Sequence, residues 1–253
     1  MKILTYNVLC YGCENHNWFD RKDDVTEIVR ERMPDIFGLQ EAHKDWMDVF
    51  TEKFPDYGYV GVGRDDGIDK GEFSPVFYKK DRFDLIDSGY FWISETPDKP
   101  SYGWDADCIR IASYAKLCEK ASGKVFVAMD THLDHIGVEA RKNGVRLINE
   151  KASEFNCPVV LTGDFNIFEG TDCYVDMIDA GLFKDAKFLA PQLECAYTYH
   201  PYFHHKERDR YYCIIDFVFV TKEFKVNNYH VIDDKKHGAY PSDHCPVVVD
   251  VEL

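Results

Sequence analysis

Short apolar runs, each long enough for one buried strand, recur along this chain, and several of them end in a carboxylate, amide or imidazole side chain. A charged group inside such a strand is costly unless a partner or a metal ion compensates it. Ligand sites in α/β sheets gather at the carboxyl ends of the strands. The pattern therefore predicts an α/β fold with a ligand site where several buried strands end.

The residues that show this pattern are rich in oxygen donors. Read singly, an isolated acid at a strand end is usually a loop cap or a surface charge, and a histidine such as His132 is usually structural. As an ordered set they favour a hard cation such as Mg²⁺, which binds carboxylate and amide oxygens and keeps waters for a substrate. The set comprises Asn7 after 3–6, Glu41 after 36–40, His132 after 125–131, Asp164 and Asn166 after 159–163, Asp216 within 214–219, and Asp243 and His244 before 245–249.

Strand-like and helix-like segments alternate along the chain, with no linker, repeat or low-complexity stretch. We therefore predict one mixed α/β domain over residues 1–253. Helical spacing of apolar residues predicts helices over 20–33, 46–54, 138–155 and 174–180, and Pro34 ends the first. Strands are predicted over 2–8, 35–41, 57–62, 75–78, 83–91, 109–118, 124–131, 158–162, 214–220, 225–231 and 247–251.

The formal net charge of -15 bears on the class of substrate. Proteins that hold duplex DNA through many phosphate contacts usually present a basic face. The charge therefore argues against broad duplex binding, although acidic surfaces are also ordinary for soluble proteins.

The nine cysteines are scattered without a regular frame, which argues against a secreted disulfide scaffold. We interpret Cys10 and Cys13, a C-x-x-C pair, as reduced thiols in a loop, with a redox pair or half a zinc site as the alternative. The N-terminal stretch lacks a signal-peptide pattern, and no apolar stretch could span a membrane. We expect a cytoplasmic monomer. His200, His204 and His205 could hold zinc, but we favour a loop over a pocket there.

The ordered set resembles the successive motifs of the endonuclease/exonuclease/phosphatase superfamily, from residue 3 to 249. A stretch between residues 91 and 112 resembles a bacterial branch related to the deadenylase and nocturnin group. The resemblance implies a four-layer α/β/β/α sandwich, with two mixed sheets face to face and helices outside. It also implies a phosphoester hydrolase that depends on Mg²⁺, with Mn²⁺ as a substitute. The motifs are Thr5-Tyr6-Asn7, Leu39-Gln40-Glu41, Thr131-His132-Leu133-Asp134-His135, Gly163-Asp164-Phe165-Asn166, Ile215-Asp216-Phe217 and Ser242-Asp243-His244-Cys245-Pro246-Val247.

The resemblance assigns roles around the metal and the attacking water. Glu41 is implied to be the main metal ligand, with Asn7 beside it and Asp243 as a further ligand. Asp164 is implied to orient or deprotonate the attacking water. Asn166 would fix both Asp164 and the phosphate.

A second group of roles concerns the phosphate. His244, oriented by Asp216, is implied to face it, since a carboxylate behind an imidazole sets its tautomer and favours the cation. His132 stands where the pancreatic deoxyribonuclease and deadenylase branches have histidine and the exonuclease III branch has tyrosine. Arg110 is a candidate phosphate clamp because a guanidinium binds phosphate through two hydrogen bonds.

Three functions remain open from the sequence. The first is hydrolysis of a small phosphorylated molecule, a nucleotide or a short single strand. The second is a DNA endonuclease or exonuclease. The third is an inactive binding module, which the presence of the complete motif set disfavours.

Overall fold

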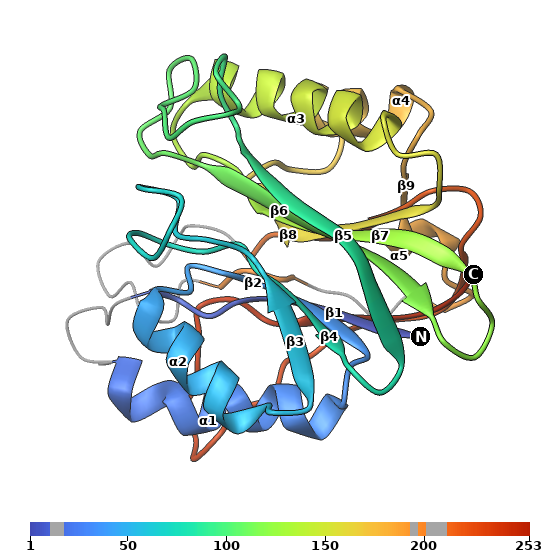
Figure 1. Ribbon diagram of the computed structural model, residues 1–253. Helices are drawn as coiled ribbons and strands as arrows, with labels where there is room; N and C mark the ends of the chain where they lie inside the picture. The colour runs from blue at the N-terminus through green and yellow to red at the C-terminus, as the bar shows by residue number, and fades with distance from the viewer. Residues whose placement is uncertain (11–17, 193–196, 201–211) are drawn as a thin grey trace.

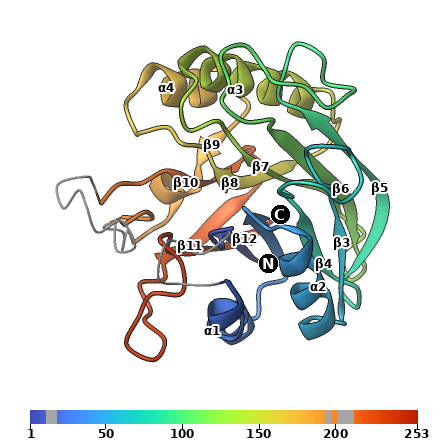
Figure 2. The ribbon, with the colours of Figure 1, turned by 90° about the vertical axis from the view of Figure 1, so that its left-hand side faces the viewer.

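The structure is a computed structural model that describes residues 1–10, 18–192, 197–200 and 212–253. Two six-stranded sheets pack face to face between two pairs of helices. Viewed from the end of the sandwich in Figure 2, α3 and α4 lie above the sheets, and α1 and α2 lie below them. This arrangement confirms the predicted α/β/β/α sandwich of two mixed sheets (Figure 1).

The first sheet has the strand order β11-β12-β1-β2-β4-β3. Its central strands β1 and β2 run parallel because α1 (Trp18–Arg32) crosses over between them, and the other neighbours are antiparallel. α2 (Lys44–Lys53) packs with α1 on its outer face through Trp46 and Phe50. The strands are β1 (Lys2–Asn7), β2 (Ile36–Gln40), β3 (Tyr57–Val60), β4 (Val76–Lys79), β11 (Lys225–Val231) and β12 (Val247–Glu252).

The second sheet has the order β5-β6-β7-β8-β10-β9. β7 and β8 form its parallel pair, joined by α3 (Val138–Ser153), and α4 (Asp172–Asp179) packs beside α3. The strands are β5 (Phe83–Trp92), β6 (Ile111–Glu119), β7 (Val125–His132), β8 (Val159–Asp164), β9 (Lys184–Asp185) and β10 (Asp216–Val220).

The two sheets meet in a buried apolar layer. Val and Ala side chains from both sheets, with Ile3, Ile36 and Phe126, fill the space between them. The parallel pairs β1–β2 and β7–β8 face each other across this layer. Asn7 at the end of β1 donates a hydrogen bond to Asp164 at the end of β8, so the carboxyl ends of both pairs lie at the same end of the sandwich, together with the predicted site residues.

Predicted and observed elements agree to within two residues at each end, apart from two short elements. The strand predicted over 109–118 begins at Ile111, because the segment before it is a loop whose backbone donates hydrogen bonds to Asp134. β9 and the short helix α5 (Ala186–Leu189) were not predicted, because both are too short to show a periodic pattern. Among the described residues, none of the helices has the length and apolar character that a membrane span requires.

Candidate active site

Seven of the nine predicted site residues line one cavity of about 650 Å³, which opens where the central parallel strands end. The other two, Asn7 and Asp216, lie behind its wall and hydrogen-bond to residues that form it. The sequence pattern therefore identified side chains that the fold brings together. The seven are Glu41, Arg110, His132, Asp164, Asn166, Asp243 and His244.

Glu41 leaves the end of β2 in a left-handed backbone conformation, with φ at 60°. Such a conformation is uncommon for a residue with a side chain, and it concentrates at functional sites. Its Oε1 accepts a hydrogen bond from Asn7 Nδ2 at 3.0 Å, and its Oε2 accepts one from Cys10 N at 2.9 Å. Asn7 Nδ2 also donates to Asp164 Oδ2 at 3.0 Å, so one buried amide joins the two carboxylates.

Asp164 ends β8, and the turn after it shapes the cavity floor. Gly163 has a φ of 156°, and a Cβ there would lie 2.2 Å from the backbone oxygen of Thr131, so only glycine fits. Asn166, also left-handed at φ 50°, donates its backbone N–H to Asp164 Oδ1 at 3.0 Å. Its amide Nδ2 donates to the backbone oxygen of Leu133 at 3.1 Å. The Gly-Asp-Phe-Asn motif is thus a rigid turn that fixes the carboxylate.

His244 and Asp216 form a buried pair. His244 Nδ1 lies 2.8 Å from Asp216 Oδ2 and 3.1 Å from Oδ1, and its Nε2 lies 3.7 Å from Asp164 Oδ2. Burial lowers the pKa of an imidazole, but Asp216 and Asp164 outweigh it and raise the pKa of His244 well above its ordinary value. Burial, reinforced by Asp216, raises the pKa of Asp164 to about 7. The site therefore holds an imidazolium beside a carboxyl group that titrates near neutrality.

His132 flanks Asp164 on the other side. Its Nε2 lies 3.4 Å from Asp164 Oδ2 and 3.2 Å from Asn166 Nδ2. Its Nδ1 faces Glu72 Oε2 at 3.8 Å, which is too long for a hydrogen bond. Burial lowers the pKa of His132 well below its ordinary value, and neighbouring arginines add to the effect. His132 is therefore neutral, in contrast to His244.

Glu72 is the site residue that sequence reasoning missed. It is held in an ion pair with Arg64 and lies 3.7 Å from Arg110 Nη1. Burial raises its pKa, although Arg64 opposes this. No apolar strand ends at Glu72; the next residue, Phe73, is fixed by a bridge to Ala42. The only local signal is that Glu72 lies just before the apolar run that forms β4.

Arg110 lies in the cavity wall, 5% exposed, and faces two carboxylates. Its guanidinium lies 3.7 Å from Glu72 and 3.8 Å from Asp134, and its Nη2 is 3.3 Å from His135 Nδ1. Asp134 also accepts backbone hydrogen bonds from its own loop, at Ile136 and Gly137, and from the separate loop of Asp107 and Cys108, which holds the two loops together. Arg64 and Arg141 line the same wall, so this side of the cavity carries three guanidinium groups.

The sequence profile of the Endonuclease/Exonuclease/phosphatase family matches residues 4–244. The chain belongs to this family. Its members are metal-dependent phosphoester hydrolases, and the match confirms the family that the sequence motifs indicated.

Solved structures of the family place the chain beside bacterial members. A mannosyl-6-phosphatase of Bacteroides thetaiotaomicron is 34% identical, with a TM-score of 0.92 over 100% of both chains. A family protein of Bacteroides vulgatus is 37% identical, with a TM-score of 0.92 over 100% of this chain and 98% of the other. The human nocturnin catalytic domain, at 21% identity and a TM-score of 0.76 over 100% of this chain and 94% of that one, shares the fold.

Members of this family typically bind a divalent metal, and the cavity is lined by residues with carboxylate side chains, among them Glu41, Asp164 and Asp243. Among the described residues Glu41 forms no ion pair, and its oxygens accept hydrogen bonds only from neutral groups. Within the part of the chain that the structure describes, no cationic side chain pairs with this carboxylate. The Asp243 carboxylate lines the same cavity, and Ser242 holds that segment against β1 by donating to the Asn7 backbone oxygen at 2.7 Å. These oxygens suit a hard cation.

His200 is the one histidine of the alternative zinc site that lies within the described residues. His200 is buried, with its ring centroid 4.2 Å from that of Tyr240, and burial lowers its pKa to about 4. The other two histidines of that site, His204 and His205, lie outside the described residues, as does Cys13 of the Cys10–Cys13 pair.

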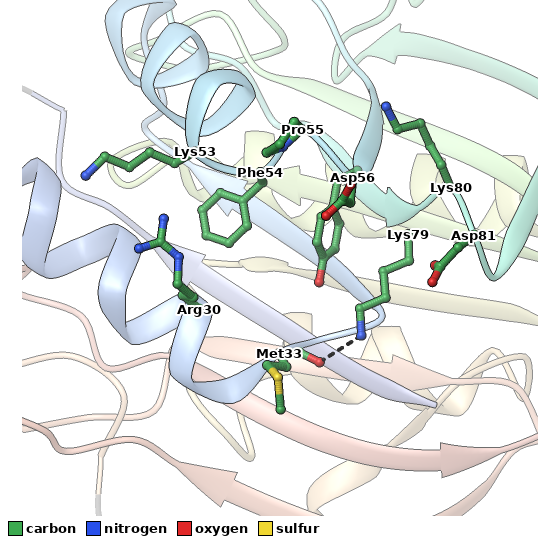
Figure 3. A pocket seen from close by; sticks show the side chains of 10 residues that line it. Arg30, Met33, Lys53, Phe54, Pro55, Asp56, Lys79, Lys80 and Asp81 are labelled. Carbon is green, nitrogen blue, oxygen red and sulfur yellow. Dashed lines mark hydrogen bonds between the residues drawn. The ribbon is translucent and has the colours of Figure 1, made fainter.

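A second cavity, of about 690 Å³, opens at the start of β2, the opposite end of that strand from Glu41 (Figure 3). Although four cationic side chains line it, Lys79 bonds to Asp35 at 3.1 Å and Lys53 pairs with Asp23. Its lining contains no histidine, and we assign it no part in phosphoester chemistry. The lining residues are Arg30, Met33, Lys53, Phe54, Pro55, Asp56, Tyr57, Lys79, Lys80 and Asp81.

Proposed function

We propose that this chain is a Mg²⁺-dependent phosphatase for small phosphorylated molecules, with sugar phosphates as the first substrate class to test. The observation that carries the proposal is one cavity in which an acid of near-neutral pKa, Asp164, lies between the cationic His244 and the carboxylate Glu41, which forms no ion pair among the described residues. That combination suits a phosphate held by positive charge next to a proton acceptor.

The metal would be held by Glu41, with Asn7 and Asp243 beside it. When bound, Mg²⁺ supplies positive charge that neutralises the phosphoryl oxygens. In this structure the Asn7 nitrogen faces Glu41 and Asp164, and its oxygen accepts a hydrogen bond from Leu9 N at 3.0 Å. Asn7 would therefore act as a ligand only after its amide turns.

The remaining residues would bind the phosphate and move the proton. Asp164 orients the attacking water and takes its proton, and Asn166 holds Asp164 in place. The His244 imidazolium donates to a phosphoryl oxygen, where negative charge builds up in the transition state. Asp216 fixes the tautomer and ring of His244. His132, whose Nε2 lies beside Asp164 and Asn166, is neutral and would contact the phosphate without adding charge.

The volume and the lining of the cavity favour a small substrate. A volume of about 650 Å³ lies in the range of small-molecule sites. The arginine-rich wall around Arg110 would hold the phosphate or polar groups of the leaving alcohol. The Bacteroides thetaiotaomicron relative is described as a mannosyl-6-phosphatase and aligns over the whole chain, which supports a phosphorylated sugar. The charge of -15 disfavours duplex DNA.

A substrate panel tests this proposal. Hexose 6-phosphates, nucleoside monophosphates, dinucleotides, single-stranded oligonucleotides and duplex DNA would each be incubated with Mg²⁺ or Mn²⁺, with a chelator and the Glu41→Ala variant as controls. We expect phosphate release from a small monoester that both controls abolish. Salt-sensitive cleavage of duplex DNA would promote the nuclease alternative. No turnover of any substrate with either metal would favour the inactive binding module.

A further inference from the structure

A second layer of polar side chains bridges the two sheets directly beneath the active site. Thr5 and Gln40 come from the first sheet, and Asp130 and Thr162 come from the second. All four are buried, at 0% to 4% exposure, at the edge of an otherwise apolar inter-sheet core. Buried polar groups persist where hydrogen bonds compensate them, so this layer needs a structural or functional reason.

Three of the four residues of this layer occupy the same strand and the same face as a site residue. Side chains on a strand alternate between faces, so residues two apart point to the same face. Three members lie two residues before a site residue on the same strand, and Gln40 directly precedes Glu41. The three pairs are Thr5 and Asn7, Asp130 and His132, and Thr162 and Asp164.

Asp130 is the centre of this layer. Its Oδ1 accepts hydrogen bonds from Gln40 Nε2 at 2.8 Å and from Thr162 Oγ1 at 2.7 Å. Gln40 Nε2 also donates to Thr5 Oγ1 at 3.0 Å. One carboxyl oxygen thus joins β7 and β8 of one sheet to β2 of the other.

The backbone of β2 leaves room for this contact. A Cβ on Gly38 would lie 2.0 Å from Asp130 Oδ1 and 2.6 Å from Thr162 Oγ1. Gly38 has no left-handed φ, so its conformation does not demand glycine. The close approach of Asp130 does, because any side chain would displace the carboxyl group from Gln40.

The second oxygen of Asp130 is buried and makes no hydrogen bond among the described residues. Asp130 Oδ2, Gln40 Oε1 and Ser113 Oγ lack hydrogen-bond partners among the described residues. Burial raises the pKa of Asp130 well above its ordinary value, and the charges of Asp164 and Asp216 add to this. A neutral carboxylic acid therefore fits the position, and asparagine would match its shape while supplying a donor.

We propose that Asp130 is a positioning residue. It joins the two sheets in the layer of side chains next to the active site, and it thereby sets the distance between Glu41 and the His132–Asp164 pair. The inference rests on the proposed function in one respect, the binding of Mg²⁺ at Glu41. The competing explanation is a buried hydrogen bond that stabilises the core and does nothing for the site.

The test compares two aspartates of similar burial. Asp130→Leu removes the tie, while Asp130→Asn keeps the shape and the acceptor oxygen. Asp185→Leu is the matched control, because Asp185 is 4% exposed, accepts hydrogen bonds from Tyr174 Oη and Lys187 N, and lies in β9, away from the cavity. Melting temperature, Mg²⁺ affinity by calorimetry, and kcat and KM on a small phosphomonoester are measured for each. Thr162→Val, which removes one donor, is the milder variant in case Asp130→Leu does not fold.

We expect both leucine variants to melt at lower temperature, but only Asp130→Leu to weaken Mg²⁺ binding and lower kcat, each by about tenfold or more, as is typical when groups behind metal ligands are lost. Asp130→Asn should stay within about threefold of wild type, and Thr162→Val should fall between the two. Wild-type Mg²⁺ affinity and kcat in the folded Asp130→Leu or Thr162→Val variant would overturn the inference, as would equal damage from Asp130→Asn. A wild-type protein that binds neither Mg²⁺ nor Mn²⁺ would instead overturn the proposed function.

Discussion

Asp216→Asn tests whether the buried aspartate acts through His244 or only stabilises the fold. The substitution keeps the shape but removes the charge that lies 2.8 Å from the imidazole Nδ1. A hydrogen bond to a charged group contributes about 1.5–3 kcal/mol. At about 1.4 kcal/mol for each factor of ten, kcat should fall roughly 10- to 100-fold. His244→Ala removes the donor itself and should cost about 10²–10³ in kcat.

The double variant separates the two explanations, with kcat and melting temperature measured for all four proteins. If Asp216 acts only through His244, the double variant should be about as slow as His244→Ala alone, because groups that act as a unit are not additive. Additive losses would mean that Asp216 has a separate task. A melting temperature that falls in Asp216→Asn while kcat stays at the wild-type value would refute the dyad.

Three further predictions concern separate parts of the molecule. Glu41→Ala should weaken Mg²⁺ binding in calorimetry and lower kcat by orders of magnitude while the fold survives; wild-type affinity would remove Glu41 from the metal site. Asp164→Asn should bind substrate but turn it over about 10²–10⁴ times more slowly, and a loss of only a few-fold would mean that another group activates the water. Burial raises the pKa of Asp185 to about 6, so the stability it contributes is present at low pH and lost as pH rises through about 6. Asp185→Asn should therefore gain stability relative to wild type between pH 4 and 7, by up to about 3 kcal/mol in denaturant titrations; a pH-independent difference would contradict the shift.

Most of the predicted site residues share a local signature, which explains why a single sequence could predict that they lie together. Glu41 follows an apolar run directly, and Asp164 ends one, so each is visible without knowledge of its partners. Parallel neighbours then bring the strand ends together, because β1–β2 and β7–β8 each point their carboxyl ends to the same side. The helices and most strands were predicted for the same reason, since their periodicity is local.

The missed residues depend on contacts between distant segments. Glu72 follows no apolar strand, and its position is set by the bridge between Phe73 and Ala42. Asp130 lies inside an apolar run that predicts only a strand, and its partner Gln40 is 90 residues away. Arg110 was predicted as a phosphate clamp, but its ion pairs with Glu72 and Asp134 become visible only when the three loops are assembled. A single sequence carries no local signal for such pairings.

Two histidines flank Asp164, and one is a cation while the other is neutral. The distance from each imidazole to the nearest carboxylate behind it explains the difference. Asp216 lies 2.8 Å from His244, close enough to outweigh burial and hold the ring as a cation. Glu72 lies 3.8 Å from His132, and its charge is drawn to Arg64 and Arg110, whose positive charges act on the same ring. The second imidazole therefore stays neutral. Asp164 consequently has a cation on one side only, so a phosphate beside it would meet a charged donor from His244 and an uncharged ring from His132.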